Sequence, residues 1–204
     1  MKALLIVDVQ HDFLPGGALE VKDGDKIIPI INKLQSKFDF IVGTQDWHPE
    51  NHLSFAANHK GKKPGEIIKL DGMDQILWPV HCVKESHGSQ FHPYLKTEGW
   101  KKVFKKGTNP KIDSYSGFFD NHKRQDTGLG KYLKENGVDT VYVVGLAADY
   151  CVKFTVLDAV SEGFKTYLVK DGTRAVNLEP NDFEKAIKDM EEAGAQMVKS
   201  EDLI

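Results

Sequence analysis

Short apolar runs recur along the chain, and they predict buried strands. The runs are apolar rather than alternating, which is typical of strands covered on both faces of a parallel sheet. They cover residues 3–7, 40–43, 102–105, 140–146, 166–169 and 195–198, and the run at 102–105 is the weakest. The sequence therefore favours a sheet of six mostly parallel strands.

Helical periodicity occupies most of the intervals between these runs. Apolar residues recur at three- and four-residue spacing within 27–34, 129–133, 152–160 and 183–190. This spacing predicts amphipathic helices, and Asn181 is a candidate cap for the last of them. Strands and helices in alternation predict an α/β fold, with a doubly wound sheet and helices on both faces. Such a three-layer α/β/α arrangement is Rossmann-like.

One long segment interrupts the alternation. Residues 45–100 contain no clean strand pattern and only scattered helical signal, yet they hold six of the eight histidines. A connection of this length inside a compact domain is usually functional. The chain of 204 residues is therefore expected to form one domain, 1–204, with a metal-binding insertion at about 45–100.

Composition narrows the range of functions. The net charge is −3 with both signs mixed, which argues against a nucleic-acid-binding or membrane-surface protein. Two cysteines cannot build a dense disulfide framework, so we expect a reducing, cytoplasmic location. The N-terminal run MKALLIVDVQ is too short for a signal peptide, and no segment is apolar enough to span a bilayer.

Chemically active side chains follow four of the predicted strands. In chain order they are Asp8, then Asp46 with His48, then Lys106, then Cys151. Ligands of an open parallel sheet bind beyond the carboxyl ends of its strands. We therefore expect these side chains to meet at one rim of the sheet.

Cys151 stands where a predicted strand turns into a helix. The positive end of a helix dipole lowers the pKa of a thiol, and free N–H groups there can hold an oxyanion. Asp8 is a candidate base for this thiol, and Lys106 would pair with Asp8. Two plainer interpretations stay open at this point: Cys151 as a packing residue, and Asp8 with Lys106 as a structural ion pair.

A second group of residues suits a metal ion. The stretch QDWHPENH contains Asp46, His48 and His52, and WPVHC adds His81. One carboxylate with two or three imidazoles suits Zn²⁺, Fe²⁺ or Mn²⁺ and leaves coordination positions open. The alternative is a polar loop of solvated histidines. Cys82 is expected to pack, and surface or ordinary hydrogen-bonding roles are expected for the remaining histidines, which are His11, His59, His87, His92 and His122.

Several motifs occur in an order that points to a known family. They are IVDVQHDF with PGGAL, QDWHPENHLSF, WPVHCV, VFKKG, YSGF and GLAADYC. From its first residues to Arg174, the chain resembles the nicotinamidase (pyrazinamidase) branch of the isochorismatase-like cysteine hydrolases. The resemblance implies an amidohydrolase that acts on a linear amide C–N bond. It would convert nicotinamide to nicotinate and ammonia through a cysteine thioester in NAD salvage, with pyrazinamide as a further substrate.

The resemblance also implies catalytic roles for individual residues. Cys151, Asp8 and Lys106 would form a catalytic triad, with Cys151 as nucleophile and Asp8 as general base. The backbone amides of Ala147 and Cys151 would form the oxyanion hole. A cis peptide between Leu146 and Ala147 would turn the first of these amides toward the site.

A substrate pocket and a metal site follow from the same resemblance. The pocket would be lined by Phe13, Leu19, Trp78 and Tyr115. One divalent ion, zinc first with iron or manganese as alternatives, would be bound by Asp46, His48 and His81. His52 would either ligate the ion or form a hydrogen bond beside it.

Two other functions are compatible with the sequence. A related small-amide or N-carbamoyl hydrolase would keep the scaffold, but such relatives generally lack the metal residues. A non-catalytic metal-binding or redox-sensing protein would use Cys151 as an oxidisable thiol and would leave Asp8 and Lys106 unexplained. The expected partner is a small molecule, the substrate nicotinamide. Binding to nucleic acid or to a membrane is not expected, and the sequence is compatible with a homo-oligomer.

Overall fold

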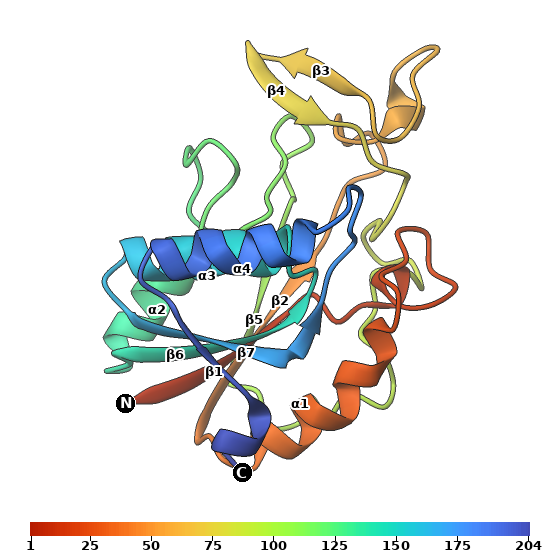
Figure 1. The fold of residues 1–204 in the computed structure, drawn as a ribbon. Coiled ribbons are helices and arrows are strands. Elements are labelled where there is room, and N and C mark those ends of the chain that lie inside the picture. The colour runs from red at the N-terminus through yellow and green to blue at the C-terminus, as the bar shows by residue number, and fades with distance from the viewer.

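The computed structural model describes all 204 residues and arranges six strands in one parallel sheet (Figure 1). The strands are β1 (Lys2–Val7), β2 (Phe40–Asp46), β5 (Lys102–Lys106), β6 (Thr140–Leu146), β7 (Lys165–Arg174) and β8 (Gln196–Val198). Their order is β5-β2-β1-β6-β7-β8, and every neighbouring pair is parallel. The chain builds outward from β1 to β5 and then returns to β6, so the direction reverses between β1 and β6. The predicted six-stranded α/β fold is confirmed.

Helices cover both faces of the sheet. One face is covered by α1 (Ile27–Gln35), and the other by α2 (Leu129–Glu135), α3 (Cys151–Ser161) and α4 (Asp182–Glu192). The two cores explain the continuous apolar pattern of β1, because Leu4 packs on the α1 side and Leu5 on the α3 side. A fully buried leucine contributes roughly 1.5–3 kcal/mol to stability. None of the helices combines the length and apolarity needed to cross a bilayer.

A hairpin lies inside the segment for which no strand was expected. It consists of β3 (Ile67–Leu70) and β4 (Met73–Ile76), and it projects away from the three layers in Figure 1. Asp71 and Gly72 join the strands, both with positive φ (48° and 80°), as the tightest hairpin turns require. The expectation of no strand was wrong here. The strands are short and largely exposed, so their apolar pattern is weak, but the Asp-Gly pair was a usable signal.

Three strands continue past the carboxyl ends of their apolar runs. β2 continues to Asp46, where a strand was predicted only to residue 43, β5 continues to Lys106, and β7 continues to Arg174, where a strand was predicted only to residue 169. The extra residues of β2 are polar yet buried, and Asp46 lies opposite Lys106 in the strand register. The apolar pattern therefore predicts too short a length for these strands at the ends that reach the functional site. Asn181 is the N-cap residue of α4, as predicted, but its side chain makes no capping bond.

Candidate active site

Four segments bring a thiol, two carboxylates and an ammonium group together at the carboxyl edge of the sheet. Asp8 directly follows β1, Asp46 and Lys106 end β2 and β5, and Cys151 begins α3. The Lys106 Nζ lies 2.8 Å from Asp8 Oδ2 and 3.3 Å from Cys151 Sγ, and it also pairs with Asp46. It donates a further hydrogen bond to the Ser114 carbonyl at 2.9 Å. Residues at or just beyond the carboxyl ends of four strands far apart in the sequence thus meet at one point.

Burial governs the protonation of these groups. It raises the pKa of the fully buried Asp8 to about 6, although the charge of Lys106 opposes the shift. Burial alone would also raise the pKa of Asp46, but Lys106 and His48 hold it well below its ordinary value. Burial raises the pKa of the Cys151 thiol well above its usual range, despite Lys106. Burial therefore outweighs the effect expected of the helix terminus and favours the thiol form of Cys151 over the thiolate.

Two backbone N–H groups beside the thiol have no acceptor within the protein. They belong to Ala147 and to Cys151 itself, at the turn between β6 and α3. The peptide between Leu146 and Ala147 is cis. The Ala148 N–H donates to the Arg174 carbonyl at 2.7 Å, which ties the turn to the end of β7. Free donors at this position can hold an oxygen atom on which negative charge develops.

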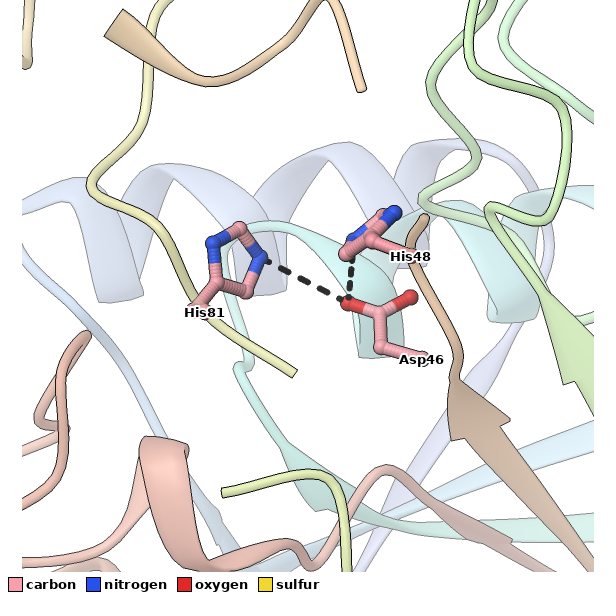
Figure 2. A group of neighbouring side chains, drawn as sticks. All are labelled: Asp46, His48 and His81. Atoms are coloured by element: carbon pink, nitrogen blue, oxygen red, sulfur yellow. Dashed lines mark ion pairs between the residues drawn. The ribbon is translucent and has the colours of Figure 1, made fainter. Parts of the chain in front are cut away.

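A carboxylate and several imidazoles form a buried cluster next to the thiol. Figure 2 shows His48 and His81 turned toward Asp46; their Nε2 atoms lie 3.5 and 3.9 Å from Asp46 Oδ2. The ligand atoms of these three residues lie within 4.8 Å of one another. His52 belongs to a second set of the same kind, with His48 and Asp113. His48 is shared by both sets, so the two groups of ligand atoms are continuous.

Hydrogen bonds from outside the cluster orient its imidazoles. The Nδ1–H groups of His48 and His81 donate to backbone carbonyls at 2.9 and 2.8 Å, those of Gly107 and Pro79. This tautomer leaves an Nε2 lone pair free on each ring, and the buried Nε2 of His48 has no hydrogen-bond partner. Burial lowers the pKa of His81 to about 4, so its ring is neutral at pH 7. Burial alone would lower the pKa of His48, but the Asp46 carboxylate raises it above its ordinary value. An orphaned nitrogen beside a neutral imidazole and a charged carboxylate fits a divalent metal ion.

His52 is bonded differently from the other two histidines. Its Nδ1 accepts the backbone N–H of Ser54 at 3.1 Å and lies 2.7 Å from the Ser54 hydroxyl. A neutral ring that accepts at Nδ1 carries its proton on Nε2, which then has no lone pair for a metal ion. The bonding of His52 therefore favours a proton on Nε2, although this atom, like His48 Nε2, is buried without a hydrogen-bond partner.

An apolar pocket adjoins both groups. It is lined by the four predicted residues, Phe13, Leu19, Trp78 and Tyr115, together with Asp46, His81, Ala147 and Cys151. The Trp78 indole N–H donates to the Tyr115 hydroxyl at 3.1 Å, and their rings stand at 83° to each other. Aromatic walls with a few converging polar groups are typical of a site for a small flat ligand.

Several residues of the site were missed in the sequence. Asp113, Tyr150 and Val176 also line the pocket. The Thr44 hydroxyl donates to Asp8 Oδ1 at 2.7 Å. Tyr150 could have been inferred from its position beside the candidate nucleophile. Thr44, Asp113 and Val176 reach the site only through the tertiary fold, and no local sequence pattern marks them.

Fold and site together define a doubly wound α/β protein with a buried thiol, carboxylate and ammonium beside a carboxylate–imidazole cluster. Comparison with known proteins identifies a family with this fold. The model of the isochorismatase domain matches residues 2–202. The chain belongs to the isochorismatase family.

Known relatives match over nearly the whole chain. A nicotinamidase of Escherichia coli is 48% identical over 200 residues, covering 96% of this chain and 93% of the relative. The structure of a nicotinamidase/pyrazinamidase of Acinetobacter baumanii superposes with a TM-score of 0.96 at 49% identity, covering 100% and 98%. The structure of a pyrazinamidase of Pyrococcus horikoshii in complex with zinc has a TM-score of 0.79 at 39% identity, covering 97% and 98%.

Proposed function

We propose that this protein is an amidohydrolase that converts nicotinamide to nicotinate and ammonia, and that it also accepts pyrazinamide. The observation that carries the proposal is the contact of Lys106 with Asp8 and Cys151 at the end of an aromatic pocket. Relatives named for this activity, 48% identical over most of the chain, support the choice of substrate. A substrate returned to NAD synthesis and a thiol that must stay reduced fit a cytoplasmic enzyme.

Cys151 is the proposed nucleophile and Asp8 the proposed general base. Asp8, with its pKa of about 6, is ionised at neutral pH and takes the proton from Cys151 as Sγ attacks the carboxamide carbon. Asp8 then gives this proton to the departing nitrogen, so ammonia leaves and a thioester remains. A water molecule next loses a proton to Asp8 and attacks the thioester, which releases nicotinate. The proton returns to the Cys151 sulfur.

Lys106 and the free backbone donors assist these steps. The buried ammonium of Lys106 holds the Asp8 carboxylate in place and offsets the negative charge that develops on sulfur. The N–H groups of Ala147 and Cys151 are the proposed oxyanion hole. Phe13 and Trp78 would hold the pyridine ring between them and so bring the carboxamide to Cys151.

One divalent ion, with zinc as the first choice, is the proposed cofactor. Asp46, His48 and His81 would hold it, while His52 would donate a hydrogen bond beside it. When bound, the ion would act as a Lewis acid toward the pyridine ring nitrogen and help to orient the ring. The zinc complex of the Pyrococcus horikoshii relative supports this choice of metal.

Ammonia release from nicotinamide tests the proposal. We expect release by the purified protein, a loss of ~10⁴-fold or more in Cys151→Ala, and a loss of activity after chelation that added zinc restores. Cys82→Ala is the matched control, because Cys82 is also a free, buried cysteine but does not line the pocket. A folded, metal-loaded wild type that releases no ammonia would show that the substrate is a different amide.

A further inference from the structure

Three histidines outside the active site gather at one surface hollow. His11 begins the short helix η1 (His11–Phe13), and His87 and His92 lie in the irregular segment before β5. The ring centroids of His11 and His87 are 4.0 Å apart, and those of His11 and His92 are 5.4 Å apart. The His11 and His87 rings are stacked at 29°, whereas the buried His48 and His81 rings lie 5.0 Å apart at 74°, so the surface rings must turn before their nitrogens converge on one ion.

Backbone hydrogen bonds hold the two segments together. The N–H groups of His11 and Asp12 donate to the carbonyls of Gln90 and Gly88, each at 3.0 Å. The His92 N–H donates back to the Val9 carbonyl at 3.3 Å. The rings therefore meet because of a fixed main-chain pairing and not because three mobile side chains happen to be close.

The three rings and two carboxylates face a hollow of about 360 Å³. Its lining includes His11, His87, His92, Asp12 and Asp25. The Asp12 carboxylate is occupied by the backbone N–H groups of Cys82 and Ala18, at 2.7 and 3.3 Å. The imidazoles, and not this carboxylate, are therefore the groups available to a ligand.

Most ring nitrogens of this group are free. The one bond from the protein is that of the Tyr94 N–H to His92 Nδ1, at 3.2 Å and exposed to solvent. Water replaces an exposed bond of this kind at little cost, in contrast to the buried bond from Ser54 to His52. His11 is half-buried and His87 exposed, so their stacked rings have room to turn their nitrogens toward one ion.

We propose that His11, His87 and His92 form a second metal site, specific for a borderline transition-metal dication such as Zn²⁺. Neutral imidazoles are preferred ligands of Zn²⁺, Ni²⁺ and Cu²⁺, whereas Mg²⁺ and Ca²⁺ require oxygen ligands. The ion would join η1, which carries Phe13 of the pocket, to the segment that contains His87 and His92.

Zinc stoichiometry tests this site without using enzyme activity. After dialysis against excess zinc, the wild type is expected to retain one more equivalent than the double variant His87→Ala/His92→Ala. The single variant His87→Ala is expected to bind this second equivalent about tenfold more weakly or worse. His122→Ala is the control for loss of a histidine elsewhere and should retain both equivalents.

The outcomes separate this site from the buried one. His48→Ala is expected to lose the buried equivalent and keep the surface one, whatever the substrate of the enzyme proves to be. Melting curves in chelator should be the same for the wild type and His87→Ala, because His87 is exposed. A folded wild type that holds one zinc, or a double variant that still holds two, would overturn the proposal.

Discussion

At the scale of single residues, burial and the charges of neighbouring groups together decide which groups carry protons. Asp8 and Cys151 both have raised pKa values because burial disfavours their charged forms, whereas Asp46 stays ionised beside Lys106. The proposed proton transfer from Cys151 to Asp8 would therefore take place between two groups whose pKa values are shifted in the same direction by burial. The Thr44 hydroxyl is the neutral donor that stabilises the Asp8 carboxylate.

Removal of that donor should shift the pH dependence of the reaction. Thr44→Val deletes the bond to Asp8 and raises its pKa above the value of about 6, by about one unit. The deprotonated carboxylate is the active form, so activity is lost as pH falls through this pKa, and a higher pKa moves the loss to higher pH. The acid limb of kcat/KM against pH measures the shift. Thr173→Val, which removes a buried hydroxyl bonded to the Gly145 carbonyl, should leave the limb in place; an unshifted limb in Thr44→Val would contradict the assignment.

At the scale of elements, the turns after the strands position the site. Gly107 follows β5 with φ of +65°, and its carbonyl accepts the hydrogen bond that orients His48. A Cβ atom at Gly107 would lie 2.3 Å from His48 Cε1, so the ring could not keep its position. The glycine is therefore required both by the backbone conformation and by the approach of the imidazole.

Gly107→Ala should weaken metal binding. Displacement of His48 is expected to lower the metal affinity by about 10- to 100-fold, as loss of an orienting contact does at other metal sites. Gly61→Ala is a matched control, because Gly61 also has positive φ (+77°) but has no atom within 4 Å of the added Cβ. Metal content after dialysis, measured in both variants, separates backbone strain from displacement of the ring. Equal metal content in the two variants would argue against His48 as a ligand.

At the scale of the whole molecule, the buried cluster connects segments that are far apart in the chain. Asp46 ends β2, whereas His81 follows the hairpin, and both meet beside Lys106 at the end of β5. An ion that binds only the folded protein would stabilise it by about 2.7 kcal/mol at a concentration 100-fold above Kd. The metal site should therefore affect the stability of the entire chain.

Chelation should lower the melting temperature. For a chain of this length, the loss of about 2.7 kcal/mol corresponds to roughly 5–10 °C. The measurement belongs in the His87→Ala background, so that only the buried cluster responds to the chelator. His48→Ala in the same background should melt at the same temperature with and without chelator. A melting temperature that does not respond to chelation in either protein would mean that no ion is held at Asp46, His48 and His81.

The α/β architecture could be predicted from the sequence because strands buried on both faces require continuous apolar residues. Leu4 and Leu5 pack into the cores on opposite faces of the sheet, so consecutive residues must both be apolar, and this pattern can be read from the sequence alone. The β3–β4 hairpin could not be predicted in this way because exposed strands do not need continuous apolar residues. The ends of β2 and β5 could not be predicted because Asp46 and Lys106 are buried as an ion pair and not as apolar residues.

The sequence by itself determined the order of the six sheet strands and the four α-helices and named the candidate reactive side chains, since both follow from local pattern and motif. Only the tertiary structure decided that Cys151 rests as a thiol and that His52 accepts a hydrogen bond at Nδ1. It also decided that Asp113 and Val176 complete the pocket. Protonation and pocket shape depend on burial and on contacts between distant segments, and these exist only once the chain has folded.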